Sequence, residues 1–182
     1  MSALAPFGGV LPAVGFVFVV IWAVILVHEL GHYYAGRRIV GIPSDDIKLV
    51  APYLPRYVAL RDGEEWVAPT ELARYRSVYE RHDPEREHEP RFAAAGEIVQ
   101  AGVVAPVGTL VGLAVDTDIG VTILSASLLV FVVYAGLDTI ATLYRGRPSG
   151  DYSLLWQSTP RLPILLGLGF ASLHVVPLMI LT

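Results

Sequence analysis

The residues best suited to chemistry are two histidines and a glutamate in the segment VILVHELGHYYAGRR. His28 and His32 are four residues apart, so on a helix both project from one face, one turn apart, where a single metal ion can bridge them. Glu29 lies about 100° round the helix from His28, close enough to reach a metal-bound water without being a ligand itself. Because the chain has no cysteine, a metal site must use His, Asp or Glu. The H-E-x-x-H pattern therefore predicts a Zn²⁺ site with Glu29 as the general base.

A zinc site of this type needs a third protein ligand, and two later aspartates are alternatives for it. Asp138 follows 19 uncharged residues counted from Ile119, and His28 follows 18 counted from Val10, so the two should lie at nearly the same depth in a membrane. This similarity in depth favours Asp138 over Asp151. Asp151 lies in the turn GRPSGDYSLLW, which could fold back toward the zinc or could cap a short interfacial helix.

Two other ionisable residues within apolar runs are expected to play lesser parts. Glu97 precedes 18 uncharged residues and so falls on the same level as His28 and Asp138. It is predicted to support the ligands rather than to bind the metal, with the alternative of an interfacial Glu at a helix start. His174 is predicted to make a hydrogen bond between helices.

The segments that must position these residues are long and apolar. The chain has 182 residues, of which 54% are hydrophobic and 16% charged, which is a poor match to a soluble domain. An all-α membrane protein of about four transmembrane helices is therefore expected, forming a single membrane domain over residues 1–182. The apolar runs long enough to span a bilayer are residues 10–35, 92–115, 119–143 and 162–181.

Residues 36–91 have a different character, because they hold ten of the thirteen basic residues. They are expected to form a small water-exposed α+β insertion. Within it, residues 57–61 and 64–67 flank Asp62-Gly63, which predicts a tight hairpin. The sequence TELARYRSVYERH predicts a short helix with Thr70 as its N-cap.

The tract ERHDPEREHEP, which follows this predicted helix, is expected to be a solvated linker. Its His82 and His88 are not expected to bind metal.

The distribution of charge predicts an orientation in the membrane. All thirteen Lys and Arg residues fall on one side of the four-span topology. By the positive-inside tendency that side, with the zinc motif and residues 36–91, is cytoplasmic in an integral protein of the cell membrane. Both termini and the Asp116 turn are then expected outside. The net charge of −4, with 17 acidic residues, argues against nucleic acid as a partner.

An H-E-x-x-H inside a membrane helix, followed by a later Asp, resembles the site-2 protease family of intramembrane zinc metalloproteases. The matching segments are VILVHELGHYYAGR, AAAGEIVQAGVVAP and an Asp in either GLDTIATL or PSGDYSLL. The resemblance covers about residues 15–155. It implies zinc bound by His28, His32 and either Asp138 or Asp151, with Glu29 as the base that activates water. It also implies hydrolysis of peptide bonds in membrane-embedded proteins or peptides.

The sequence departs from the family pattern at three places. Asp138 is followed by Thr139 instead of Gly, with no Pro before it in the span. Glu97 and Gln100 stand where family members commonly carry Pro and Asn. The Ser-Gly-Asp turn at 149–151 is similar to a variant found in divergent membrane zincins.

Cleavage inside a membrane also requires an unwound substrate, because a helix hides its carbonyls in its own hydrogen bonds. The hairpin at 57–67 is either an edge to which such a segment adds as a strand, or an ordinary hairpin. Two other functions stay open: a non-proteolytic zinc-binding scaffold or regulator that binds a partner through residues 41–91, and a small ion transporter. The transporter predicts metal or proton flux without hydrolysis.

Overall fold

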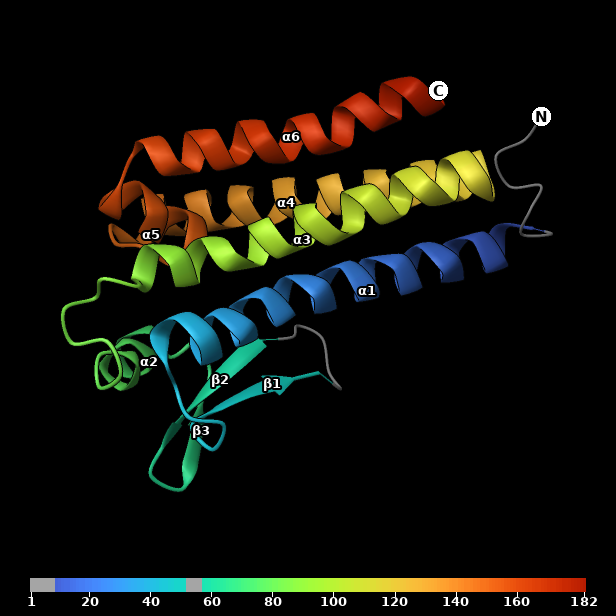
Figure 1. Ribbon diagram of the computed structural model, residues 1–182. Helices are drawn as coiled ribbons and strands as arrows, with labels where there is room; N and C mark the ends of the chain where they lie inside the picture. Colours follow the sequence, from blue (N-terminus) through green and yellow to red (C-terminus); the bar gives the residue numbers. More distant parts are fainter. Residues whose placement is uncertain (1–8, 52–56) are drawn as a thin grey trace.

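Four long apolar helices run side by side through the computed structural model, which describes residues 9–51 and 57–182 (Figure 1). Each is long and apolar enough to cross a membrane, which confirms this part of the sequence prediction. Their bounds differ from the predicted ones by at most three residues at any end. These helices are α1 (Val10–Ala35), α3 (Glu89–Ala114), α4 (Thr117–Arg145) and α6 (Arg161–Leu181).

The order of packing places α3 and α4 between α1 and α6 (Figure 1). A tight turn joins α3 to α4, in which the Asp116 carboxylate accepts a hydrogen bond of 3.0 Å from the backbone N–H of Ile119. At its other end α4 stops at Gly146, which has a left-handed backbone conformation (φ 65°). A short helix, α5 (Asp151–Ser158), then leads into α6.

A small three-stranded antiparallel sheet follows α1, after a π-helical turn, η2 (Gly36–Val40). Its order is β1-β2-β3, with β1 (Ile47–Val50), β2 (Tyr57–Asp62) and β3 (Glu65–Val67). Asp62 pairs with Glu65, so the two-residue turn is Gly63-Glu64, with Gly63 at φ 66°. The predicted hairpin is therefore confirmed, with its turn one residue later than expected.

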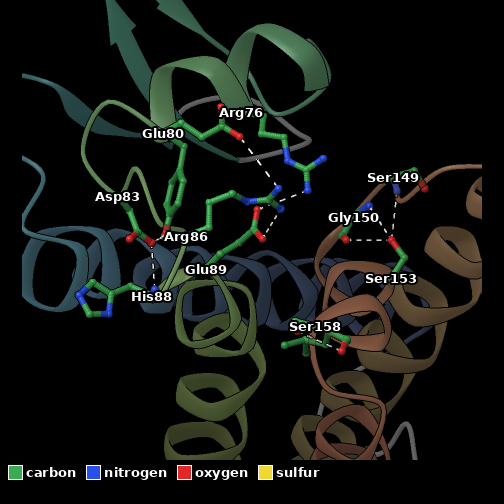
Figure 2. Close-up of polar contacts among 12 residues, drawn as sticks. Arg76, Glu80, Asp83, Arg86, His88, Glu89, Ser149, Gly150, Ser153 and Ser158 are labelled. Carbon is green, nitrogen blue, oxygen red and sulfur yellow. Dashed lines mark hydrogen bonds and ion pairs between the residues drawn. The ribbon is translucent and has the colours of Figure 1, made fainter.

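The predicted short helix is also present, as α2 (Leu72–Tyr79), with Glu71 rather than Thr70 at the N-cap position. The tract after it is more ordered than the expected solvated linker. Asp83 is buried and accepts hydrogen bonds from the Tyr79 hydroxyl and from the backbone N–H groups of Glu87 and His88 (Figure 2). This buried carboxylate holds the turn that leads into α3.

The sheet and α2 are anchored to one end of the helix bundle. Buried apolar side chains of the sheet, such as Ile47 and Leu60, pack with Val78 of α2 and with Phe92 and Ala95 of α3. The same end carries the C-terminus of α1, where the H-E-x-x-H motif lies, and all of α5 (Figure 1). The fold therefore brings the motif, the subdomain and α5 together.

Candidate metal centre

Three ligand atoms from two helices converge at this end of the bundle. The Nε2 atoms of His28 and His32 are 3.1 Å apart, and the Nε2 of His32 is 3.2 Å from Oδ2 of Asp151, the first residue of α5. All three atoms lie within 4.8 Å of one another. Both histidines are buried, with 3% and 5% of their surface exposed, while Asp151 is partly exposed. Among the described residues, this is the group that could hold a metal ion.

Each of the two histidine rings has a hydrogen-bond partner at its Nδ1 atom. This bond fixes Nε2 as the ring nitrogen that points toward the other ligand atoms. His32 Nδ1 is 2.9 Å from the Phe92 carbonyl oxygen, and His28 Nδ1 is 3.1 Å from the Gln100 side-chain oxygen. Because these oxygens only accept, each Nδ1 carries a proton, and Nε2 is the nitrogen that each ring turns toward the other.

Two imidazole nitrogens and a carboxylate at these distances are a donor set suited to a divalent cation. Ligand atoms at about 2.0–2.2 Å from a tetrahedral zinc lie roughly 3.3–3.6 Å apart, close to the separations seen here. The residues therefore fit a metal ion in both donor type and spacing.

The carboxylate form of Asp151 suits this role. Burial alone would raise the pKa of Asp151, but the facing His32, through its charge and its hydrogen bond, holds that pKa below the ordinary value. The group is therefore ionised at neutral pH, as metal binding requires.

Asp138 borders the same cavity, but its carboxylate is held by the start of α5 and the turn before it. Its carboxylate accepts hydrogen bonds from the backbone N–H of Ser153 (2.7 Å), the Ser153 hydroxyl (2.8 Å) and the Ser149 hydroxyl (3.0 Å). Gly150 packs against it so closely that a Cβ there would lie 2.9 Å from the Asp138 Cγ. Figure 2 shows the Ser149-Gly150-Ser153 turn that this carboxylate holds.

The depth argument that favoured Asp138 as the third ligand is therefore not supported by the geometry. Depth fixes the height of a residue along the membrane normal but not its rotation about the helix axis. The side chain of Asp138 faces α5, and it is Asp151 that reaches the histidines. Capping the α5 turn, the alternative considered for Asp151, falls largely to Asp138.

The two glutamates of the predicted site are both buried and line one cavity with His32 and Asp151. Glu97 lies two turns inside α3 rather than at its start, and among the described residues its Oε2 has no hydrogen-bond partner. Glu29 follows His28 on α1. Glu29, Glu97 and Asp151 are therefore among the acidic residues that line the cavity with His32.

This cavity, of about 510 Å³, lies between the helix bundle and the subdomain. Tyr57 and Val58 of β2 and Tyr75 of α2 line it together with His32 and Asp151. Burial, followed by the charges of Asp151 and Glu29, raises the pKa of Tyr75 well above its usual value. Its phenol is therefore neutral and can donate a hydrogen bond into the cavity.

Two glycines allow the helices that carry the site to approach closely. A Cβ on Gly31, inside the motif, would lie 2.3 Å from the Ala95 carbonyl oxygen of α3. A Cβ on Gly96 would lie 2.4 Å from His32 Nε2 and 2.5 Å from His28 Nε2. The backbone of α3 therefore forms the wall directly behind the two ligand atoms.

Sequence reasoning found His28, Glu29 and His32 but missed the role of Gln100, the hydrogen-bond partner of His28. A signal was present, because Gln100 is a polar residue one turn after Gly96 in an apolar run. The prediction for His174 is confirmed: its Nε2 is 2.8 Å from the Ser127 hydroxyl of α4. Neither His82 nor His88 belongs to the metal-binding group found among the described residues.

Comparison with known proteins adds no relative. No family model matches the chain, and neither the search of curated proteins nor that of solved structures found a match.

Proposed function

We propose that this chain is an intramembrane zinc metalloendopeptidase, similar to the site-2 proteases, that hydrolyses peptide bonds of membrane-embedded substrates. One observation carries the proposal: the Nε2 atoms of His28 and His32 and an oxygen of Asp151 converge at the edge of a cavity that Glu29 also lines. A structural zinc site has four protein ligands, whereas a catalytic one has three and keeps an open position. Three ligands beside a cavity favour catalysis.

His28, His32 and Asp151 would hold the ion. Zinc bound there supplies a Lewis acid that polarises a substrate carbonyl and makes water a nucleophile near neutral pH. The chain's own residues supply the rest. The Glu29 carboxylate takes a proton from the attacking water and later delivers it to the leaving amine. The neutral phenol of Tyr75, which also lines the cavity, would donate a hydrogen bond to the substrate carbonyl oxygen.

A polypeptide substrate is favoured by the shape of the subdomain's sheet. Strand β1 pairs with Tyr57–Leu60 of β2, whereas β3 pairs only with Leu60–Asp62. On the β3 side, the segment 57–59 is thus left without a partner among the described strands, and Tyr57 and Val58 border the cavity. Val58 and Ala59 are buried, so the cavity beside Tyr57 is where an extended segment of substrate would meet this side of the sheet.

The proposed location is the cell membrane, with the site on the cytoplasmic side. The described Lys and Arg residues lie at the end of the bundle that carries the site or in the subdomain and connections attached to it (Figure 1). Positive residues near membrane helices favour the cytoplasm. Cleavage would therefore take place near the cytoplasmic boundary of the bilayer.

The test is cleavage of a single-span reporter substrate reconstituted with the purified chain in liposomes. Glu29→Gln should keep its zinc and lose at least about 100-fold in cleavage rate, because it removes the base but not a ligand. Glu64→Gln, on the exposed hairpin turn, serves as the matched control and should retain activity. Cleavage by Glu29→Gln at the wild-type rate would overturn the proposal, and ion flux without cleavage would favour a transporter.

A further inference from the structure

A continuous chain of buried polar side chains runs from His28 through the bundle to α6. His28 Nδ1 meets the Gln100 Oε1 of α3 at 3.1 Å, and the Gln100 Nε2 is 3.1 Å from both the backbone oxygen and the hydroxyl of Ser127 on α4. The Ser127 hydroxyl is 2.8 Å from His174 Nε2, and His174 Nδ1 is 2.8 Å from the Phe170 carbonyl oxygen. All four side chains are at most 3% exposed. The chain therefore links four helices.

Two backbone carbonyls fix the direction of every hydrogen bond in this chain. The Phe170 oxygen can only accept, so His174 Nδ1 carries a proton, and the Nε2 of the neutral ring accepts from the Ser127 hydroxyl. The Ser127 backbone oxygen also only accepts, so the amide nitrogen of Gln100 must face α4.

The oxygen of the Gln100 amide then faces His28. Because this oxygen accepts a hydrogen bond, the Nδ1 of His28 must be the donor, and the Nε2 of His28 carries the lone pair. The direction set at α6 and α4 thus determines which nitrogen of His28 faces His32 and Asp151.

We propose that Gln100, Ser127 and His174 are positioning residues that hold His28 in the Nδ1-protonated tautomer, with Nε2 aimed at His32 Nε2 and Asp151. The inference rests on the proposed metal centre and extends it, because it gives α4 and α6, which supply none of the three ligands, a part in metal binding. Outer hydrogen bonds of this kind fix ligand tautomers in metalloproteins.

The tautomer can be read directly from the ¹⁵N chemical shifts of the histidine rings in the metal-free full chain, with His28→Ala used to assign the signal. The wild type should show a protonated Nδ1 and a bare Nε2 at His28. Gln100→Leu should release the ring into a mixture of tautomers, whereas Gln100→Glu should keep the wild-type form because it keeps the acceptor. Ser127→Ala should give a smaller change than Gln100→Leu, because the backbone oxygen of Ser127 still orients the amide. The control is Ser125→Ala, an exposed serine on the same helix.

Zinc affinity, measured by competition with a chelator, gives the second reading. Gln100→Leu should weaken binding by roughly 10- to 100-fold, and Ser127→Ala or His174→Phe by several fold. Because Ser127 acts through Gln100, the double variant should bind no more weakly than Gln100→Leu alone.

An unchanged His28 tautomer in both Gln100→Leu and Ser127→Ala would overturn the inference, even if these variants lost thermal stability. Additive losses of affinity in the double variant would also overturn it. If Gln100→Leu does not fold, an unchanged His28 tautomer in Ser127→Ala overturns the inference on its own. A wild type that binds no zinc would defeat the proposed function, while the metal-free tautomer would still decide the inference.

Discussion

Asp138 and Asp151 are thirteen residues apart, yet their carboxylates face different partners. Asp151 meets His32, whereas Asp138 receives hydrogen bonds from Ser149 before Asp151 and from Ser153 after it. One carboxylate is thus placed to bind metal and the other to hold the backbone that presents it. The division explains why two acidic residues near the cavity are not interchangeable.

Replacing each aspartate by asparagine should separate these roles. Asp151→Asn removes a charged ligand and should lower zinc affinity by more than the roughly 100-fold that loss of an outer hydrogen bond causes. Asp138→Asn keeps one acceptor oxygen and should lower it by only about 10- to 100-fold. Chelator competition on the purified variants measures both. The reverse order of losses would show that Asp138 is the ligand.

At the scale of elements, the close approach of α1 and α3 brings the site together. Gly96→Ala places a methyl group within 2.5 Å of both ligand nitrogens, so the helices must separate or the rings must turn away. We expect this variant to insert in the membrane and to lose zinc and activity. Gly102→Ala, on the same helix with nothing within 4 Å of its Cβ, is the matched control. Normal zinc content in Gly96→Ala would contradict the described packing.

A second contact between elements ties β2 to α2 through ion pairs. Hydrogen bonds from Arg74 and Arg81 hold the pKa of Asp62 below its ordinary value of 3.8. A carboxyl group with a lower pKa in the folded state contributes stability above its ordinary pKa and loses it as the pH falls through the folded-state value. The stabilisation that these ion pairs give the folded state is modest because they are exposed, and it is weaker at high salt.

Wild-type protein should therefore unfold at a higher temperature than Asp62→Asn at pH 7. The difference should vanish as the pH is lowered well below 3.8. Thermal unfolding in detergent at several pH values measures it. A difference that persists unchanged in acid would show that Asp62 stabilises the subdomain by other means.

Contacts within one helix of the site could be predicted from the sequence, whereas contacts between two elements could not. His28 and His32 were recognised because helix periodicity fixes the relation of residues four apart. The contact of His32 with Asp151 depends instead on how α5 packs against α3 and α4, and no helix encodes that packing in its own periodicity. The same holds for Gln100, whose role appears only when α3 lies against α1. The four spans were predicted closely because length and hydropathy alone define them.

At the scale of the whole molecule, the candidate site lies at one end of the bundle and the α3–α4 turn at the other (Figure 1). Because the chain has no cysteine, single cysteines can report the orientation without background. We expect Asp118→Cys to react with a membrane-impermeant maleimide from outside the cell, and Ser77→Cys only after the cytoplasmic face is opened. Labelling of both from the same side would contradict a topology in which α1 and α3 each cross the bilayer.

The most direct test of the metal centre is the zinc content of the full chain purified without chelators, measured by elemental analysis alongside cleavage of the single-span reporter. We expect about one zinc per chain in the wild type. We also expect loss of both metal and cleavage in His28→Ala, because that variant removes a ligand. A wild-type chain that cleaves the reporter without stoichiometric zinc, or that binds none at all, would contradict the proposal that His28, His32 and Asp151 form a hydrolytic zinc site.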